Sequence, residues 1–438
     1  MTASMRWASA ISTRASLEAA VTEVTQQATQ QLGITQPGVE PTLAFVFIST
    51  AFVSEYSRLL PLLHEQLNVD HIIGCSGTGV VGMADDFPEE VEEGPALSLT
   101  LAYLPNVTVK SFHLTGADLP DLDSPPTAWS KLLGVEPAQQ PNFILMADPF
   151  SSGTSELLQG MDFAYPGCPK VGGLAGLESF NNSSGLFCHK KVHKEGIVGV
   201  ALSGEIVLET IVAQGCRPIG ELYRVSEGER NIMLKLTKAD EADELGDRTE
   251  DETPLEILQN IFQGLNEEDR ELAQNALFIG VAQSGFKPSL TRRDFLIRNL
   301  VGVDPRNGSI AVADKIRPGM RIQFHMRDAQ TSAEDLENLL RRYRVERLED
   351  KIDSTAQSAS PVGALLFSCT GRGVGLYEES NFDSDLFEQY LGPLPIGGFF
   401  CNGEIGPVGT TTFLHGFTSV FGICCQPNNK VPENKVPE

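Results

Sequence analysis

One pattern occurs three times along this chain of 438 residues: a short apolar strand, a helix, and a second apolar strand that ends in glycine. The first strands are expected at AFVF from Ala44, FILM from Phe143 and ALLF from Ala364, and the glycines are Gly74, Gly172 and Gly397. The spacing from strand start to glycine is 30, 29 and 33 residues. Such regular spacing predicts that one supersecondary unit is used three times.

A further apolar strand follows about 20 to 25 residues after each glycine. These strands begin at Ala96, Gly196 and Gly416, and they are rich in β-forming residues. The repeated unit is therefore a β-α-β-β module. We expect a mixed α/β fold of two similar halves, in which repeated modules build mixed sheets covered by helices.

Other elements lie before and between the modules. Ser16 can cap a helix with apolar positions Leu17, Ala20, Val21, Val24 and Ala28. Between the second and third copies we expect strands at 276–282, 295–303, 309–314 and 320–326. A turn is expected at 304–308, and a helix at 332–347 with Ser332 as its cap.

Two stretches of biased composition suggest the domain boundaries. The acidic run 239–254 reads as a solvated loop. The tail after Gln426 repeats Asn-Lys-Val-Pro-Glu and is expected to be disordered. We therefore predict an N-terminal domain over 1–225, a C-terminal domain over 226–425 and a disordered tail over 426–438.

The charge balance limits the partners. Lys and Arg number 33 against 58 Asp and Glu, a formal net charge of −25. Nucleic acid and anionic membranes bind through basic surfaces, so neither is expected as a partner. No segment reaches the roughly 18 apolar residues of a membrane span, so no membrane insertion is expected. Small molecules and proteins remain.

The cysteines and the N-terminus indicate the compartment. Eight cysteines are scattered without a disulfide framework, and the N-terminus lacks the apolar core of a secretory signal. We expect a cytoplasmic protein with reduced thiols.

The strongest local cluster is LLFSCTGRG, followed after a helix by GGFFCNGEIGPVG. Arg372 comes just after a predicted strand, where α/β sheets usually bind ligands, and its guanidinium can grip a carboxylate. Glu404 lies in an apolar, glycine-rich segment and needs a partner there. That partner is either Arg372, in a structural ion pair, or a ligand ammonium group.

Weaker constellations point to other chemistry. Gly74–Gly82 resembles a phosphate loop, but carboxylates follow it where a helix with Lys-Ser/Thr is needed. The cluster of Cys188, His189 and His193 has no second ligand set for a metal. A thiol-dependent enzyme using Cys369 or Cys401 stays open as an alternative. The sequence leaves enzymatic activity undecided and favours a binding role.

The order of GCSGTGVVG, GGLAGLESF, the Arg-rich stretch from Phe295, SCTGR and NGEIGPVG resembles the FIST family, named for F-box and intracellular signal transduction proteins. The resemblance runs from about Arg6 to Ile423. It implies a FIST N part and a FIST C part that bind a small ligand, with amino acids or related carboxylate metabolites as proposed ligands. The motif match carries this role to Cys369, Arg372, Gly403 and Glu404.

Further ligand-binding candidates are the glycine turns and the cysteine beside the first of them: Gly74, Cys75, Gly172, Gly173, Gly397 and Gly398. No kinase, cyclase or methyl-accepting segment is recognisable, so a separate signalling or effector protein is the expected partner. A protein-interaction scaffold is a further alternative.

No cofactor is expected from the residues themselves. Some members of the family look like haem-based gas sensors, so haem stays an alternative. The candidate axial ligands are the seven histidines His64, His71, His113, His189, His193, His325 and His415.

Overall fold

The computed structural model describes residues 4–33, 40–177, 184–239, 251–283, 287–352 and 359–428. Contacts divide the chain into two compact units: unit 1 is Met1–Val212, Glu337–Leu414 and Thr418–Glu438, and unit 2 is Ala213–Leu336 and His415–Phe417. The domain boundary predicted near residue 225 falls inside unit 2 and stays a prediction. The acidic run and the tail lie largely outside the described residues, at 240–250 and 429–438.

The first repeat of unit 1 shows how the sequence sets its elements. It contains β1 (Arg6–Ser12), α1 (Leu17–Leu32), β2 (Leu43–Ser49), α2 (Tyr56–Gln66), β3 (His71–Gly77), β4 (Val80–Ala84), β5 (Phe87–Val91) and β6 (Leu97–Tyr103). The hydroxyl of Ser16 caps α1 by accepting from Ala19 N, and Gly33 ends the helix in the left-handed region. All five predicted apolar positions of α1 are buried, which confirms the helix and its inward face.

The second repeat has the same order of elements. It contains β7 (Val107–Leu114), α3 (Pro126–Leu133), β8 (Asn142–Ala147), α4 (Thr154–Ala164), β9 (Lys170–Leu174), β10 (Leu186–Cys188), β11 (Lys191–His193) and β12 (Ile197–Gly204). The predicted β-α-β-β module is thus part of a longer unit, β-α-β-α-β-β-β-β, which adds a strand and a helix before it and a hairpin before its last strand.

The third repeat is interrupted by unit 2. It contains β13 (Val207–Gln214), α7 (Ala329–Ile352), β20 (Ala359–Cys369), α8 (Val374–Tyr377), α9 (Phe382–Leu391), β21 (Ile396–Cys401), β22 (Glu404–Val408), β23 (Thr411–His415) and β24 (Thr418–Pro427). Most of the chain of unit 2 lies between β13 and α7. The repeats therefore account for the whole of unit 1.

Each repeat builds a mixed sheet with the same strand order. The orders are β1-β6-β2-β3, β7-β12-β8-β9 and β13-β24-β20-β21. In each sheet the central pair is parallel, as β2 is to β3, and the strand before that pair is antiparallel. The predicted mixed α/β class is confirmed.

Every sheet is completed by a hairpin from another repeat. The hairpin β10–β11 of repeat 2 pairs with β3 of repeat 1, and β22–β23 of repeat 3 pairs with β9 of repeat 2. The hairpin β4–β5 of repeat 1 pairs with β21 of repeat 3 and closes the cycle. The three repeats therefore exchange hairpins in a ring.

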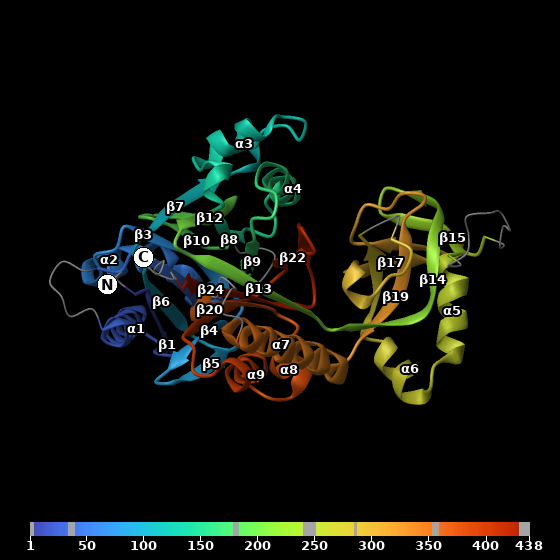
Figure 1. The fold of residues 1–438 in the computed structure, drawn as a ribbon. Coiled ribbons are helices and arrows are strands. Elements are labelled where there is room, and N and C mark those ends of the chain that lie inside the picture. Colours follow the sequence, from blue (N-terminus) through green and yellow to red (C-terminus); the bar gives the residue numbers. More distant parts are fainter. Residues whose placement is uncertain are drawn as a thin grey trace, which may run out of the picture. The chain divides into compact units, whose positions relative to one another are not determined.

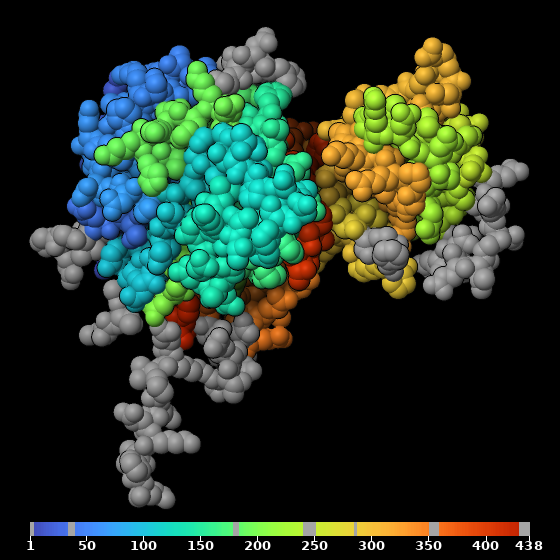
Figure 2. Space-filling view, turned by 90° about the horizontal axis from the view of Figure 1, so that it is seen from above, coloured from blue at the N-terminus to red at the C-terminus, as the bar shows by residue number. Residues whose placement is uncertain are grey.

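The three sheets share one core. Their inner faces meet in a single cluster that includes Phe47 of the first sheet, Val200 of the second and Phe367 of the third. The helices lie outside: α1 and α2 against the first sheet, α3 and α4 against the second, and α7 and α9 beside the third (Figure 1). In Figure 2 the blue surface of repeat 1 adjoins the teal and green surface of repeat 2.

Three glycines occupy the same place in the three parallel pairs. Gly74 lies opposite Val46, Gly172 opposite Leu145 and Gly398 opposite Leu366. A Cβ atom on each would lie 1.8, 1.8 and 1.9 Å from the carbonyl oxygen of that neighbour. In the third repeat the equivalent glycine is thus Gly398 and not the predicted Gly397, because the strand register places Gly398 opposite Leu366.

Unit 2 is a closed six-stranded barrel in the order β14-β15-β18-β17-β16-β19. Its elements are β14 (Cys216–Glu229), β15 (Ile232–Lys238), α5 (Pro254–Gly264), α6 (Glu267–Ala273), β16 (Leu277–Ala282), β17 (Phe295–Asp304), β18 (Ser309–Val312) and β19 (Arg321–Arg327). These confirm the four strands predicted here. The predicted cap of α7 is wrong: Asp328 accepts from Thr331 N, whereas the Ser332 hydroxyl donates to Gly215 O. Among the described helices, none has the length and apolar character needed to cross a membrane.

Gly398→Ala should destabilise unit 1 severely, because the new Cβ would collide with the fixed backbone oxygen of Leu366. We expect a loss of about 3 kcal/mol or more in the free energy of unfolding, measured by urea denaturation. Gly375→Ala is the matched control, since a Cβ there meets nothing within 4 Å. Equal stability of the two variants would contradict the proposed close approach.

Candidate functional site

Arg372 lies just beyond the carboxyl end of β20 and is fully buried. Its guanidinium forms a bidentate ion pair with Asp383 in the first turn of α9: Nε lies 2.8 Å from Oδ2 and Nη2 lies 2.8 Å from Oδ1. Nη2 also donates to the Tyr377 hydroxyl, and the Tyr377 ring centre lies 5.4 Å from Cζ. A buried arginine held by two hydrogen bonds to one carboxylate has a fixed direction.

Asp383 is the centre of this network. Its Oδ2 also accepts hydrogen bonds from Ser368 Oγ at 2.9 Å and Ser419 Oγ at 2.7 Å. Burial alone would raise the pKa of Asp383, but the charge and hydrogen bonds of Arg372 outweigh it and the pKa is lowered. Burial likewise opposes the charge on Arg372, yet Asp383 raises the pKa of that guanidinium. Both groups are therefore charged.

The contacts of Nη1 differ from those of the other two nitrogens of this buried cation. Among the described residues, none accepts a hydrogen bond from Arg372 Nη1. Leaving a buried, charged donor without a partner costs a few kcal/mol, so such groups usually indicate a missing partner.

The exchanged hairpin of repeat 1 adds two carboxyl groups to the network. Glu90 Oε1 accepts from Ser384 N at 2.7 Å, and Glu90 N donates to Asn381 Oδ1 at 2.8 Å. Burial, and then the charge of Asp383, raises the pKa of Glu90 to about 8. Glu92 Oε1 accepts from Val374 N at 2.8 Å, and burial raises its pKa as well. Glu90 therefore carries a proton at neutral pH.

Glu404 lies in a second network beside the first. It is fully buried, and its Oε2 accepts from Thr418 N at 3.1 Å. Thr418 precedes Ser419, the residue that donates to Asp383, so the two networks meet on β24. Arg372 was one of the two partners left open for Glu404, but its guanidinium fork is directed at Asp383.

The repeat register shows that Glu404 replaces an apolar residue. It lies opposite Gly173, as Val80 lies opposite Phe399 and Leu186 lies opposite Cys75. Val80 and Leu186 belong to the central apolar core. A carboxylate at this position costs stability, so a structural role alone does not account for it.

The predicted cysteines surround these groups. Cys369 is near enough to Arg372 to raise the pKa of the guanidinium. Burial, followed by the charges of Glu404, Cys75 and Cys369, raises the pKa of Cys401 well above its ordinary value. Burial also raises the pKa of Cys75. A neutral, buried thiol is a poor nucleophile, which weighs against Cys401 as the nucleophile of a thiol-dependent enzyme.

Iodoacetamide near pH 7.5 should therefore label Cys75 and Cys401 slowly in the folded protein. Cys168, which is partly exposed, provides an internal reference for the same digest. We expect rapid labelling of all the thiols only after denaturation, followed by peptide mass spectrometry. Fast alkylation of native Cys369 or Cys401 would instead favour a catalytic thiol.

The candidate glycines are packed against protein atoms. A Cβ on Gly173 would lie 2.4 Å from Cys401 Sγ, and one on Gly397 would lie 2.1 Å from Thr100 Oγ1. The carbonyl of Gly403 accepts from Leu174 N where the strands of repeats 2 and 3 cross. Close packing explains these glycines, and a role in ligand binding stays a prediction.

Sequence reasoning missed Asp383, Glu90 and Glu92. No spacing along the chain connects residue 90 with residue 384; only the exchanged hairpin brings them together. The sequence held one weak indication of Asp383: this residue lies on the helix predicted after the first strand of the third module.

The histidines lie on both units. His71 Nδ1 and His189 Nε2 both bond to Ser111 Oγ, at 2.8 and 3.0 Å. The rings of His113 and His193 stack at 3.6 Å. Within the described residues, no cluster of three or more His, Cys, Asp or Glu side chains could hold a metal ion. The haem alternative stays a hypothesis.

Buried His325 should make unit 2 sensitive to acid. Burial lowers the pKa of His325 from its ordinary value of 6.5 to about 4, so the unfolded chain binds its proton more readily. Stability is retained above pH 6.5 and is lost as the pH falls toward 4. Between pH 7 and 4.5 this loss is about 2 to 3 kcal/mol.

His325→Phe keeps a ring against Phe295 and removes the titration. Urea unfolding of unit 2 at pH 7 and 4.5 should give a smaller difference for this variant than for the wild type. An unchanged difference would show that other groups carry the acid sensitivity.

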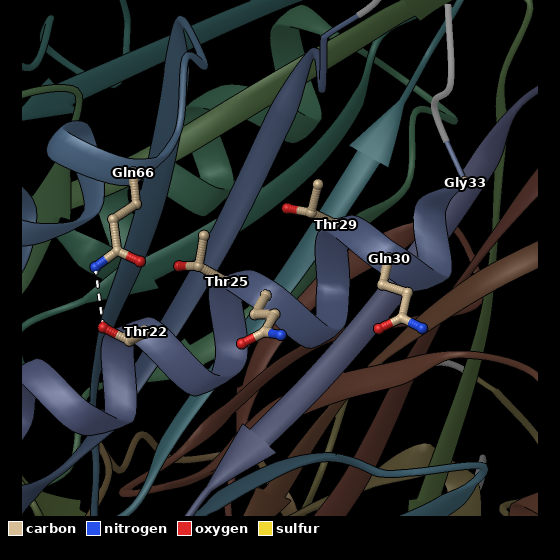
Figure 3. Close-up of a pocket in the computed structure, with 7 residues that line it drawn as sticks. Thr22, Thr25, Thr29, Gln30, Gly33 and Gln66 are labelled. Carbon is tan, nitrogen blue, oxygen red and sulfur yellow. Dashed lines mark hydrogen bonds between the residues drawn. The ribbon is translucent and has the colours of Figure 1, made fainter.

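A shallow hollow of about 560 Å³ lies along the outer face of α1 (Figure 3). Thr and Gln side chains line it, and Gln66 Nε2 donates to Thr22 Oγ1 at 3.3 Å. None of the described side chains that line this hollow is charged, so they offer nothing to pair with a carboxylate or an ammonium group.

Comparisons with known proteins agree with this architecture. The FIST N domain matches residues 42–238 and the FIST C domain matches residues 254–407. These two domains define a protein of the class associated with signal transduction and sensing. An uncharacterized protein of Mycobacterium tuberculosis strain H37Rv is 31% identical over 425 residues, covering 96% of this chain and 99% of that protein. An uncharacterized protein of Mycobacterium bovis is 30% identical over 407 residues, covering 92% and 95%. The chain belongs to the FIST family, which confirms the resemblance.

Proposed function

We propose that this protein is a small-ligand-binding member of the family, and that its ligand is an amino acid or a related carboxylate metabolite. Arg372 binds the carboxylate. The observation that carries the proposal is the buried Nη1 of Arg372, which no described residue accepts from. A ligand carboxylate is the acceptor that a guanidinium fork recognises best.

The surrounding groups favour the same ligand. Glu90 is neutral at physiological pH, so it offers a hydroxyl donor and not a second repelling charge. Glu404, at a position that is apolar in the other repeats, is the candidate partner for an ammonium group of the ligand. Cys369 and Gly403 belong to the same proposed site.

Two further parts of the proposal concern the cell. All eight cysteines are free thiols, which suits the reducing cytoplasm. The ligand-induced signal passes to a separate signalling or effector protein, as the sensing role of the family suggests.

The test is a thermal-shift and calorimetric screen of amino acids and simple organic carboxylates against the wild type and Arg372→Lys. Lysine keeps the positive charge beside Asp383 but removes Nη1 and the fork. We expect the variant to lose carboxylate binding by roughly 30-fold or more, since losing one partner of a buried charge pair costs about 2 kcal/mol or more.

Arg298→Lys is the matched control, because Arg298 also pairs with a single aspartate, Asp314, but in unit 2. Circular dichroism establishes that both variants fold. If Arg372→Lys bound the same carboxylate as tightly as the wild type, Arg372 would not be its binding residue.

A further inference from the structure

A polar cavity lies at one end of the sheet that repeat 2 builds. It has a volume of about 610 Å³ and lies where β7 and β8 end and β12 begins. Asp148, Phe150 and Ser151 line it from the loop after β8, and Lys194 and Glu195 line it from the loop before β12. The carboxyl ends of strands are where α/β sheets place ligands.

The repeat register relates this cavity to the site at Arg372. Asp148 comes three residues after Leu145, just as Ser49 follows Val46 and Cys369 follows Leu366. In repeat 1 this end is closed, because Ser49 Oγ donates to Gly94 O and accepts from Ala96 N. In repeat 3 Cys369 is at this position, and the buried Arg372 comes three residues later in the chain. In repeat 2 the residues at this end line the cavity.

The floor of the cavity is a buried carboxylate without a countercharge. Asp148 is only 6% exposed. Three neutral donors hold it: Ser184 Oγ at 2.9 Å, Ser151 Oγ at 3.0 Å and Phe150 N at 3.2 Å. It forms no ion pair with any residue in the described part of the chain. Buried charges in proteins are normally paired, so the Asp148 carboxylate is a candidate to bind a cationic group of a ligand.

The rim provides the other contacts. Lys194 and Glu195 are exposed, and the Phe150 side chain is 59% exposed although it is a large apolar group. An aromatic ring beside a carboxylate suits an ammonium group, and the Lys194 ammonium suits a carboxylate. The cavity therefore offers one ammonium group, on Lys194, two carboxylates, on Asp148 and Glu195, and an apolar surface.

We propose that this cavity is a second ligand site that binds a free amino acid, with the ligand ammonium group on Asp148 and the ligand carboxylate on Lys194. The inference rests on the ligand class of the proposed function but not on Arg372. It differs from that site in the residues on which binding depends, which are Asp148 and Lys194 here and Arg372 there.

The experiment is isothermal titration with the twenty common amino acids. The tightest binder is then compared with its N-acetyl derivative and with the amine that lacks its carboxylate. The wild type should bind the amino acid at least tenfold more tightly than either derivative. Asp148→Asn should abolish this preference over the N-acetyl form, and Lys194→Met should abolish it over the amine.

Lys194→Met and Phe150→Ala change exposed side chains, so they keep the test valid if Asp148→Asn fails to fold. Lys190→Met, an exposed lysine on the neighbouring β10–β11 turn, is the matched control and should bind like the wild type. Arg372→Lys should retain the ammonium-dependent binding, which separates this site from the first. Unchanged amino acid binding in Lys194→Met and Phe150→Ala, or loss of that binding in Arg372→Lys alone, would overturn the second site.

Discussion

The exchange of hairpins among the three repeats is the constraint on which the rest of unit 1 depends. The fifth and sixth strands of each sheet come from another repeat, so no repeat can satisfy the backbone groups along its own open edge. The three inner faces then share one apolar core, which none of the sheets could bury alone. Unit 1 is therefore expected to fold as one cooperative structure, although its chain is interrupted by unit 2. The exchange also has a chemical consequence, because the hairpin of repeat 1 carries Glu90 and Glu92 to the network of repeat 3.

Within this near-symmetric frame, the positions that differ among the repeats are the informative ones. Gly74, Gly172 and Gly398 are the same because the same backbone oxygen approaches each of them. The residue after each of these glycines, however, pairs with a strand from another repeat. In two sheets its partner is an apolar core residue, Val80 or Leu186, and in the other sheet its partner is Glu404. At the end of the first strand the equivalent residues are Ser49, Asp148 and Cys369. The fold forms with an apolar residue or a small hydroxyl at the equivalent positions of other repeats. It therefore does not require the buried carboxylates of Glu404 and Asp148, and their presence needs another explanation.

The sequence predicted the elements of the fold well and their partners poorly. Apolar periodicity and turn residues identified the helices α1, α2, α4 and α9 and the parallel strand pairs, because local interactions decide these. The exchange of hairpins was not predictable, because the sequences of β4–β5 and β10–β11 do not indicate which sheet edge each hairpin pairs with. For the same reason Arg372 was recognised as a residue able to bind a carboxylate, while Asp383, the carboxylate that it pairs with, was not foreseen. Asp383 lies 11 residues after Arg372, on α9 and outside both motifs, whereas Glu404 lies within the second motif.

The electrostatics of the Arg372 network limit which ligand the proposed site could bind. The ion pair of Arg372 and Asp383 is neutral as a whole, and protonated Glu90 adds no charge. A simple anion bound to Nη1 would therefore leave one uncompensated negative charge in a buried place, in a protein that already carries a net charge of −25. A zwitterion brings its own compensating charge, and the carboxylate of Glu404 lies in the adjoining network on β24. In a buried site of low dielectric, a ligand charge without an opposite charge beside it is costly, and a ligand whose charges are all paired is favoured. Simple carboxylates should bind more weakly here than amino acids of the same size, which ties the identity of the ligand to the charge balance of the site.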